Sequence, residues 1–577
     1  MSQSTLNWKI VGAAGEGIKS TGMMFSKTLL RSGFYAFDYT EYPSLIRGGH
    51  NTYQVYASGQ PVYSQVLPLD LFISLNPDGL KLHTEELTPT SVTLFDGVDL
   101  KLDPRDLKLP GQVFSVPLTQ LARDGGGERV MANNVALGIS LQLLHLDLTI
   151  LNQVIADTFA GKNQAVVSLN QKAAALGYQY AAEHLSPLAI NLIKAPQPPR
   201  HSLTGNEAIA LGLIAGGLKA YLAYPMTPSS SILHSLADWQ AKANLLVKHA
   251  EDEIGVINMA LGMSYAGIRA AVGTSGGGFC YMTEALGLAG IAELPLVIIE
   301  AQRPGPALGM PTWTAQADLL FAINAAQDEF PRIVLAPGDV TEAFTLAKLS
   351  LTLAEEYQLP VILLSDKHLS ESAMWATLPA GPFSHPQTSI DHQPQLSDQG
   401  FFPRYQPTPT GISLRTIPGI PHGQYLANSY EHDQHGLATE TAAVRQVQMH
   451  KRQTKLNQIL SHLPQQFYDG SEHPQLTLIG FGSTKTVLQA AAQTLKTKGH
   501  DVAVFNLSWL WPFPSDQVNQ VFSQSQNTLI FEGNYTQQLA RLIRQQTGLK
   551  PTHQVSKYDG RPFYPHEVVQ AAEELLS

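Results

Sequence analysis

The sequence contains a single cysteine, Cys280, among its 577 residues. One thiol cannot form an internal disulfide, and an iron–sulfur cluster usually takes four thiolates. Any electron-transfer centre that works with this chain must therefore belong to a partner. Because no candidate base lies near Cys280 in the sequence, we predict that it is a small buried hydrophobe rather than a nucleophile.

Long apolar runs and excess positive charge are also missing. No run reaches the roughly 18 apolar residues of a membrane span, and the N-terminus lacks a basic region followed by an apolar one. We therefore expect a soluble, cytoplasmic protein without a membrane contact. The formal charge of −10 gives no basic field for nucleic acid. None of the 19 histidines has zinc-type spacing, so no metal site is predicted on this chain.

What is present is the composition of a packed α/β protein, with 44% hydrophobic and 15% charged residues. A chain of this length is too long for one core and should form three or four domains. The predicted segments are an α/β domain over 1–195, a second over 205–370, an extended connector over 371–470 and a third, small α/β domain over 475–577.

Each predicted domain alternates apolar strands with helical stretches, which favours doubly wound sheets. In 205–370 the strands are rich in Val, Ile and Leu, as in AAVGTS and LPLVIIEAQ, which indicates a parallel sheet covered on both faces. Ligands of such sheets bind beyond the carboxyl ends of the strands. Candidate groups that follow strands in this region could therefore meet at one edge.

Two of these candidates are a hydroxyl and a set of acids. Thr227 lies in YPMTPSS (224–230), which also suits an ordinary strand-to-helix turn with Ser229 or Ser230 as the helix cap. The acids 251–253 open a helix, where they could simply compensate the helix dipole. Alternatively, a carboxylate there could be held against a ring nitrogen, with its pKa raised by apolar neighbours.

Further candidates are an arginine and two glycine clusters. Arg303 follows the strand LPLVIIEAQ and could bind a carboxylate or form a structural ion pair. Residues 276–278 are three glycines after a strand, which permit close approach of a ligand or form a plain turn. Near the N-terminus, GAAGEG (12–17) suits a phosphate, and Arg47 lies beside two more glycines, although a surface turn explains these equally well.

Four motifs occur in one order: YPMTPSS, EDEIGVINMALGMSYAG, TSGGGFCYMTE and QRPGPALGMPT. With them the sequence resembles the α subunit of 2-oxoacid:ferredoxin oxidoreductases, in the arrangement where a γ-type domain precedes the α region. The tail segments FEGNYTQQLARLIR and KYDGRPFYPHEV are similar to the transketolase-like C-terminal domain of that family, and EHDQHG is similar to its connector. The resemblance covers nearly the whole chain.

The resemblance implies a γ-type domain, a thiamine-diphosphate pyrimidine-binding domain and a transketolase C-terminal-like domain. It implies oxidative decarboxylation of a 2-oxoacid, with 2-oxoglutarate favoured, to acyl-CoA and CO₂ with reduction of ferredoxin. A β subunit, in an αβ or (αβ)₂ complex, would carry the diphosphate, Mg²⁺ and a [4Fe–4S] cluster. The lack of a Gly-Asp-Gly motif and of further cysteines in this chain agrees with that division.

The resemblance also assigns roles. Glu253 would contact the pyrimidine N1′, with Glu251 as the fallback, while Thr227 and Arg303 would bind the carboxylate and carbonyl of the 2-oxoacid. The Gly-rich turn of the γ-type domain would help to bind coenzyme A. The residues expected to contact cofactors are Glu253, Glu251, Gly276, Gly277, Tyr224, Pro225, Gly12, Gly15, Gly17 and Arg47.

Several positions depart from the family pattern, and they leave the substrate open. They are Met226 for Ile, Gly277 for Pro, Ala307 and Leu308 for Ser and Thr, and Trp313 where a basic residue is common. A pyruvate-specific or other 2-oxoacid-specific member is therefore an alternative. So are another thiamine enzyme, such as a transketolase-like or indolepyruvate-oxidising relative, and a non-catalytic regulatory subunit. Retention of Thr227, Glu253 and Arg303 speaks against the last.

Overall fold

The computed structural model of the protein describes residues 4–44, 48–197, 201–379, 383, 390–398 and 400–577. The chain divides into two compact units. The first unit comprises the described residues of Met1–Leu203 with Glu371–Thr377 and Tyr564–Glu567. The second comprises those of Thr204–Ser370, Leu378–Phe563 and Val568–Ser577. Among the described helices, none is long and apolar enough to cross a bilayer.

The first unit is built on a mixed sheet in the order β6-β5-β4-β1-β3-β2-β14-β7. Its strands are β1 (Thr5–Ala14), β2 (Tyr35–Glu41), β3 (Gly48–Ser58), β4 (Leu71–Ser74), β5 (Val92–Phe95), β6 (Gln112–Ser115), β7 (His201–Thr204) and β14 (Ala373–Ala376). Strands β1, β4, β5 and β6 run parallel, whereas β3 pairs antiparallel with both β1 and β2. A doubly wound sheet was predicted here, and the α/β class is confirmed; the antiparallel strand β3 makes the sheet mixed.

Strands β2 and β3 are hard to see in the sequence because they bury polar side chains. The Asp38 carboxylate accepts hydrogen bonds from Ser26 Oγ at 2.6 Å and Tyr53 OH at 2.7 Å. Gln54 Nε2 donates to Asn7 Oδ1 at 2.8 Å. These partners compensate the burial of Asp38 and of the Gln54 amide nitrogen, and the buried polar residues remove the apolar alternation that marks a strand.

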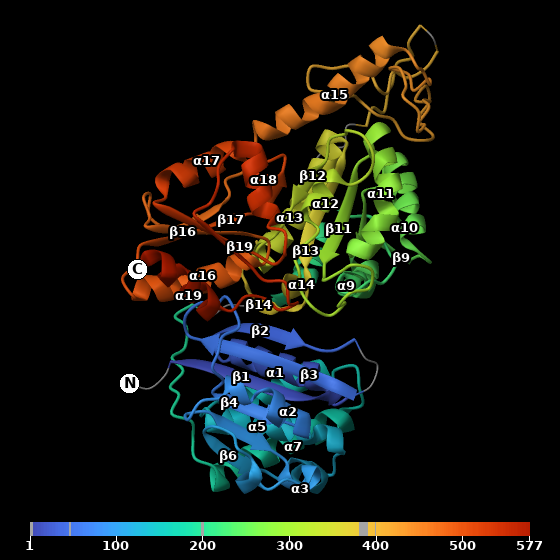
Figure 1. The fold of residues 1–577 in the computed structure, drawn as a ribbon. Helices are drawn as coiled ribbons and strands as arrows, with labels where there is room; N and C mark the ends of the chain where they lie inside the picture. The colour runs from blue at the N-terminus through green and yellow to red at the C-terminus, as the bar shows by residue number, and fades with distance from the viewer. Residues whose placement is uncertain (1–3, 45–47, 198–200, 380–382, 384–389, 399) are drawn as a thin grey trace. The chain divides into compact units, whose positions relative to one another are not determined.

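Helices cover the sheet of the first unit. They are α1 (Ile18–Arg31), α2 (Pro77–Leu82), α3 (Gly97–Leu100), α4 (Leu118–Asp124), α5 (Ala132–Leu143), α6 (Leu148–Thr158) and α7 (Gln164–His184), with short 3₁₀ turns at Thr84–Glu86, Pro104–Asp106 and Arg129–Met131. Helices α5 and α7 lie side by side (Figure 1). A Cβ on Gly138 would stand 1.9 Å from Ala174 O, so only glycine allows this close helix contact.

The second unit contains a seven-stranded sheet in the order β18-β12-β13-β11-β10-β8-β9. Its strands are β8 (Ala220–Ala223), β9 (Leu246–His249), β10 (Ala270–Thr274), β11 (Leu296–Gln302), β12 (Ile333–Leu335), β13 (Pro360–Asp366) and β18 (Trp509–Trp511). All pairs are parallel except β12–β18. The apolar residues of β8, β10, β11, β12 and β13 are buried, as their apolar content indicates, whereas Leu246 on the edge strand β9 is exposed.

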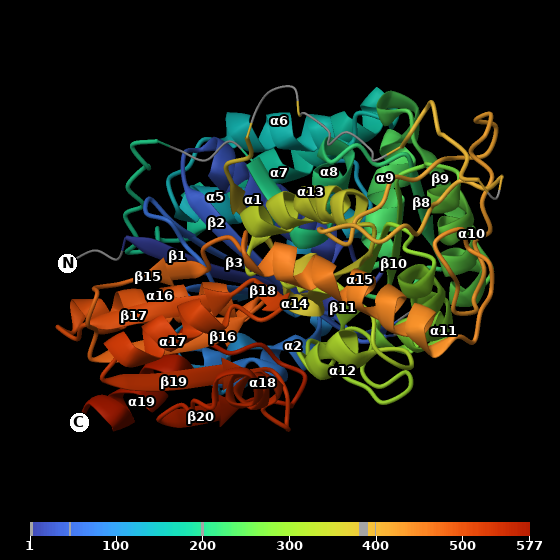
Figure 2. The ribbon, with the colours of Figure 1, turned by 90° about the horizontal axis from the view of Figure 1, so that it is seen from above.

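Both faces of this sheet are covered by helices. They are α8 (Gly205–Ala215), α9 (Ser230–Ala243), α10 (Glu253–Tyr265), α11 (Gly276–Ile291), α12 (Leu319–Asn324), α13 (Val340–Tyr357) and α14 (Lys367–Glu371). Helices α8 and α13 lie side by side (Figure 2), with Gly212 of α8 directly against the carbonyl of Phe344. The α/β class predicted for this region is confirmed.

A third sheet, in the order β15-β17-β16-β19-β20, belongs to the same unit. Its elements are β15 (Phe467–Asp469), β16 (Leu476–Phe481), α16 (Thr484–Thr497), β17 (Val502–Leu507), α17 (Ser515–Gln524), β19 (Asn527–Glu532), α18 (Gln538–Thr547), β20 (His553–Ser556) and α19 (Pro565–Leu576). Strands β16, β17, β19 and β20 are parallel, so this region is again α/β.

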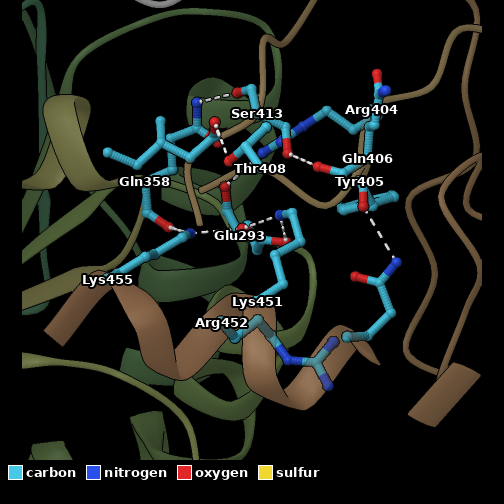
Figure 3. A network of polar contacts seen from close by, with 12 residues as sticks. Glu293, Gln358, Arg404, Tyr405, Gln406, Thr408, Ser413, Lys451, Arg452 and Lys455 are labelled. Carbon is cyan, nitrogen blue, oxygen red and sulfur yellow. Dashed lines mark hydrogen bonds and ion pairs between the residues drawn. The ribbon is translucent and has the colours of Figure 1, made fainter. Parts of the chain in front are cut away.

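The stretch predicted as an extended connector contains a long helix, α15 (Ala442–Leu460). Its buried face is polar, and Lys451 and Lys455 on it are both buried. Their Nζ atoms lie 2.6 and 2.5 Å from the carboxylate oxygens of the buried Glu293 (Figure 3). Arg404 Nη2 donates to the Glu293 carbonyl at 2.8 Å. The residues that recur on the buried face of α15 are polar and paired, so a search for apolar periodicity does not predict this helix.

Candidate active site

The carboxyl ends of β8, β9, β10 and β11 lie at one edge of the parallel sheet in the second unit. From β8 the chain passes to β9 on one side, whereas from β10 it passes to β11 on the other. The loops after β8 and β10 therefore diverge, which makes this the topological switch point where α/β sheets bind ligands. Thr227, Glu253 and Arg303 all come from the loops of this edge.

Glu253 is the first residue of α10, and its carboxylate is buried without compensation. The side chain is 5% exposed, and Oε1 has no hydrogen-bond partner among the described residues. Burial raises the pKa of Glu253 above its ordinary value. The helix is capped instead by Asp252, whose Oδ1 accepts from Gly255 N at 2.7 Å. Glu251 is exposed. Of the three acids, only Glu253 is thus buried with a carboxylate oxygen that has no partner among the described residues.

Gly278, in the first turn of α11, packs against the Glu253 carboxylate. A Cβ on Gly278 would stand 2.4 Å from Glu253 Oε1 and 2.1 Å from Thr274 Oγ1. Neither distance is compatible with a methyl group, so the glycine is what lets α11 approach the carboxylate. At Gly277 the nearest atom to such a Cβ is Ala307 O, at 3.8 Å.

Gly278→Ala is expected to displace the Glu253 carboxylate and lower turnover of the assembled enzyme by at least about tenfold. Gly287→Ala, later in the same helix, is the matched control, because the nearest atoms to a Cβ there belong to Gln327 and Ala326 and lie at 3.6 Å or more, and alanine should improve helix propensity by roughly 1 kcal/mol. Steady-state kinetics and thermal unfolding of both variants would check this. Equal activity of the two alanine variants would show that the Gly278 contact is unimportant.

Arg303 leaves β11 as a nearly buried cation, 8% exposed. Its Nη1 donates to the backbone carbonyl of Thr227 at 2.7 Å, which joins the loops after β8 and β11. Within the described ranges, no carboxylate forms an ion pair with it, and burial lowers the pKa of Arg303. A buried guanidinium without a counter-ion is costly, and a bound anion would compensate that cost.

Two hydroxyls that were not predicted as site residues are also buried and unsatisfied. Ser275 at the start of α11 is fully buried and Thr312 in the loop after Arg303 is 4% exposed. Neither Ser275 Oγ nor Thr312 Oγ1 has a hydrogen-bond partner in the described part of the chain. Because both lie at the same sheet edge as Glu253 and Arg303, they could serve as donors to a polar ligand bound there. Both residues lie inside the sequence motifs, but only the structure shows that they are unsatisfied.

The remaining predicted residues of this edge lie around the same loops. Tyr224 is 39% exposed, with its ring centroid 6.1 Å from that of His249, and Pro225 is half-buried. Ser229 precedes α9 but does not cap it through its side chain, because its Oγ donates to the carbonyl of Met226 at 2.8 Å. Gly276 lies against Asp318, whose Oδ2 would be 2.6 Å from a Cβ there.

Cys280 is exposed, so the prediction that it is a buried hydrophobe is wrong. It lies one turn into α11, and the apolar face of that helix is formed by Phe279 and Met282, both fully buried. Because α11 has apolar residues around most of its circumference, the sequence does not show whether a small residue such as Cys280 faces the core or the solvent.

The Gly-rich turn of the first unit opens α1 and adjoins a cavity of about 140 Å³. The cavity is lined by Gly15, Glu16, Asp96, Asp99 and Arg129, among others. Arg129 is already engaged, with Nη2 2.9 Å from Asp99 Oδ2 and Nη1 3.3 Å from Glu16 Oε1. A phosphate entering this cavity would have to compete with both carboxylates for Arg129.

The other residues predicted for this turn are placed differently. Gly12 belongs to β1, and a Cβ there would stand 2.7 Å from Glu16 Oε2. Gly17 takes a φ of 76° ahead of α1, and a Cβ there would stand 2.9 Å from Asn133 Nδ2, so it is packed against α5. Arg47 lies outside the described residues.

Comparison with protein families covers most of the chain. Residues 211–452 match the family described as pyruvate flavodoxin/ferredoxin oxidoreductase, thiamine diP-binding. Residues 7–180 match pyruvate ferredoxin/flavodoxin oxidoreductase, and residues 475–568 match pyruvate:ferredoxin oxidoreductase core domain II. The chain is 31% identical to 2-oxoacid:ferredoxin oxidoreductase 2, subunit alpha, from Aeropyrum pernix, over 98% of this chain and 97% of that one.

The chain belongs to the 2-oxoacid:ferredoxin oxidoreductase α-subunit family. The resemblance inferred from its motifs is thereby confirmed, and the protein is an oxidoreductase subunit. Another member, 2-oxoglutarate oxidoreductase subunit KorA of Mycobacterium tuberculosis, is 29% identical over 97% of this chain and 90% of that protein. Within this family the edge described above falls in the segment that matches the thiamine diphosphate-binding model.

A solved structure of the 2-oxoacid:ferredoxin oxidoreductase family has the same fold. The 2-oxoglutarate:ferredoxin oxidoreductase from Magnetococcus marinus, with 2-oxoglutarate, coenzyme A and succinyl-CoA bound, aligns with a TM-score of 0.92 and 30% identity. The alignment covers 100% of both chains. All three α/β regions of this chain therefore belong to the architecture of that enzyme.

Proposed function

We propose that this chain is the α subunit of a complex that converts a 2-oxoacid and coenzyme A to acyl-CoA and CO₂ while reducing ferredoxin. We further propose 2-oxoglutarate as the preferred substrate. The names of the relatives from Aeropyrum pernix and Mycobacterium tuberculosis, and the ligands named for the Magnetococcus marinus enzyme, support this choice.

The observation that carries the proposal is the buried Arg303. Its guanidinium has no counter-ion among the residues described, and it is fixed through Nη1 to the Thr227 carbonyl. A 2-oxoacid brings a carboxylate, which matches the planar fork of an arginine. The unsatisfied Thr312 hydroxyl in the same loop offers a donor for the neighbouring carbonyl oxygen. Arg303 would bind and orient the substrate at the sheet edge.

Glu253 is proposed to hold thiamine diphosphate at the aminopyrimidine ring. The buried Oε1 without a partner fits a ring nitrogen of the ligand, and the contact with Gly278 holds the carboxylate in place. When bound, the coenzyme supplies the electron sink for decarboxylation, a chemistry that no side chain can provide. Because its pKa is raised, Glu253 can hold a proton at Oε1 and exchange it with the ring nitrogen.

The remaining parts of the reaction are assigned to partners. We propose a β subunit that carries the diphosphate, Mg²⁺ and a [4Fe–4S] cluster, in an αβ or (αβ)₂ complex that delivers electrons to ferredoxin. The single, exposed Cys280 supports this division, because one thiolate cannot hold a cluster. Coenzyme A is proposed to contact the Gly-rich turn of the first unit, displacing Glu16 or Asp99 from Arg129.

A substrate panel tests the proposed preference. The purified complex is assayed for CoA-dependent dye reduction with 2-oxoglutarate, pyruvate and branched 2-oxoacids. We expect kcat/KM for 2-oxoglutarate to exceed the others by at least about tenfold, the discrimination given by one extra charged contact. A higher kcat/KM for pyruvate would refute the 2-oxoglutarate preference while leaving the reaction type intact. No turnover of any 2-oxoacid would refute the proposed function.

A further inference from the structure

Two carboxyl groups meet next to the candidate site, and in the described part of the chain neither forms an ion pair. Glu300 lies on β11, is fully buried and forms a hydrogen bond with the Asp318 carboxyl. No N–H or O–H donor of another described residue reaches either Glu300 oxygen, so the Asp318 carboxyl is the polar group beside it. A hydrogen bond between two carboxyl groups requires that one of them carries a proton. The pair therefore shares one proton.

The position of Asp318 decides which group is ionised. Its Oδ2 lies against Gly276, the first residue of the 16-residue helix α11, where a Cβ would stand 2.6 Å away. The positive end of the helix dipole favours an anion there. Glu300 is deeper, fully buried and has no such donor, so it keeps the proton and donates it to the Asp318 carboxylate.

The pair is attached to both halves of the candidate site. The backbone N–H of Asp318 donates to Gln302 Oε1 at 3.0 Å, and Gln302 immediately precedes Arg303. This bond closes the base of the loop 303–318, which carries Arg303 and Thr312. On the other side, Gly276 is two residues from Gly278, which lies against Glu253. Moving Asp318 would therefore shift the Arg303 loop relative to α11.

We propose that Glu300 and Asp318 are positioning residues, whose shared proton holds the base of the Arg303 loop against α11. This inference rests on the proposed function, because Arg303 is its readout. While the proton is present, Arg303 is held in place for the carboxylate of the 2-oxoacid. When it is lost, two buried anions face each other and the loop separates from the helix.

The surroundings of the pair make proton loss costly. Among the described residues, the titratable groups that act most strongly on Glu300 are Asp318, Cys280 on α11 and Asp366 on β13, and all three are acids. Burial, followed by these neighbours, raises the pKa of Glu300 well above its ordinary value, and burial raises that of Asp318 to about 6. Raised acid pKa values mean that the stabilising form exists at low pH and is lost as pH rises.

Glu300→Gln separates positioning from a merely structural role. The amide has the same shape and can donate to the Asp318 carboxylate at every pH, so the loop keeps its position without a proton to lose. For the wild-type complex we expect kcat/KM to fall about tenfold per pH unit above the pKa of the pair, mainly through KM. In Glu300→Gln this alkaline limb should vanish or move up by more than about one pH unit.

Two further variants complete the experiment. Glu284→Gln makes the same change at an exposed position of α11 and should leave the pH profile unchanged. Glu300→Leu removes the donor, so KM for the 2-oxoacid should be raised at all pH values, and comparison with the glutamine variant shows the rescue. An alkaline limb that is the same in the wild type and Glu300→Gln would overturn the proposal.

Thermal unfolding of the complex provides a readout that does not require turnover. The midpoint of the wild type should fall as pH rises through the pKa of the pair, and the Glu300→Gln midpoint should fall less. If no 2-oxoacid is turned over but this difference in midpoints is found, the proposed function fails and the shared proton stands. If turnover is normal but both pH dependences are identical between the two proteins, the shared proton is refuted.

Discussion

Glu253→Gln is expected to abolish CoA-dependent reduction of a viologen dye by the assembled complex. The amide keeps the size and burial of the side chain but cannot carry a proton to and from the ring nitrogen of the coenzyme. General acid–base groups of this kind contribute about 10²- to 10⁴-fold to rate. Steady-state dye reduction with saturating 2-oxoacid, coenzyme A and thiamine diphosphate measures the loss, which should appear in kcat.

The matched control is Glu251→Gln, two residues earlier in the same acidic stretch. Glu251 is exposed, whereas Glu253 is 5% exposed with an orphaned Oε1, so the same chemical change should be nearly silent at the earlier position. Near-normal turnover of Glu253→Gln, or a comparable loss in Glu251→Gln, would be incompatible with the role proposed for Glu253.

Arg303→Ala is expected to raise KM for the 2-oxoacid much more than it changes kcat. A hydrogen bond to a charged group is worth roughly 1.5 to 3 kcal/mol, which corresponds to an increase of about tenfold to 150-fold in KM. The effect should approach the upper figure, because the carboxylate of the substrate would then be buried without a counter-ion. Initial-rate measurements over a range of 2-oxoacid concentrations test it.

Arg303→Lys refines the same test. Lysine keeps the charge but lacks the planar fork that spans the Thr227 carbonyl and a carboxylate, so an intermediate KM is expected. Arg541→Ala, at an exposed position of α18, serves as the control for removing an arginine. An unchanged KM in Arg303→Ala would show that the substrate carboxylate binds elsewhere.

The parts of the fold that follow apolar patterns could be predicted from the sequence. The strands around Val272 and Ile298 are buried on both faces, and their uniform apolar character indicated a parallel sheet. The parts held by polar pairs could not be predicted. Helix α15 buries Lys451 and Lys455 on Glu293, and β2 buries Asp38 on Ser26 and Tyr53. In both, buried polar side chains take positions where the sequence pattern requires apolar ones.

The candidate site shows the same division. Strand ends are visible in the sequence, so Thr227, Glu253 and Arg303 could be placed at one edge of a sheet. Which groups are unsatisfied is decided by neighbours far apart in the chain. Examples are the buried Thr312 hydroxyl and the Glu300 carboxyl that shares a proton with Asp318. No spacing rule in the sequence reports that such a partner is missing.

The most direct test of the central claim, that this chain supplies the pyrimidine and substrate side of a shared thiamine site, is acyl-CoA formation after coenzyme depletion. The complex is stripped of thiamine diphosphate, supplied with 2-oxoglutarate, coenzyme A and an electron acceptor, and succinyl-CoA is measured by mass spectrometry. We expect formation only when thiamine diphosphate and this chain are both present. Equal formation by the partner subunit alone, or formation independent of thiamine diphosphate, would contradict the account.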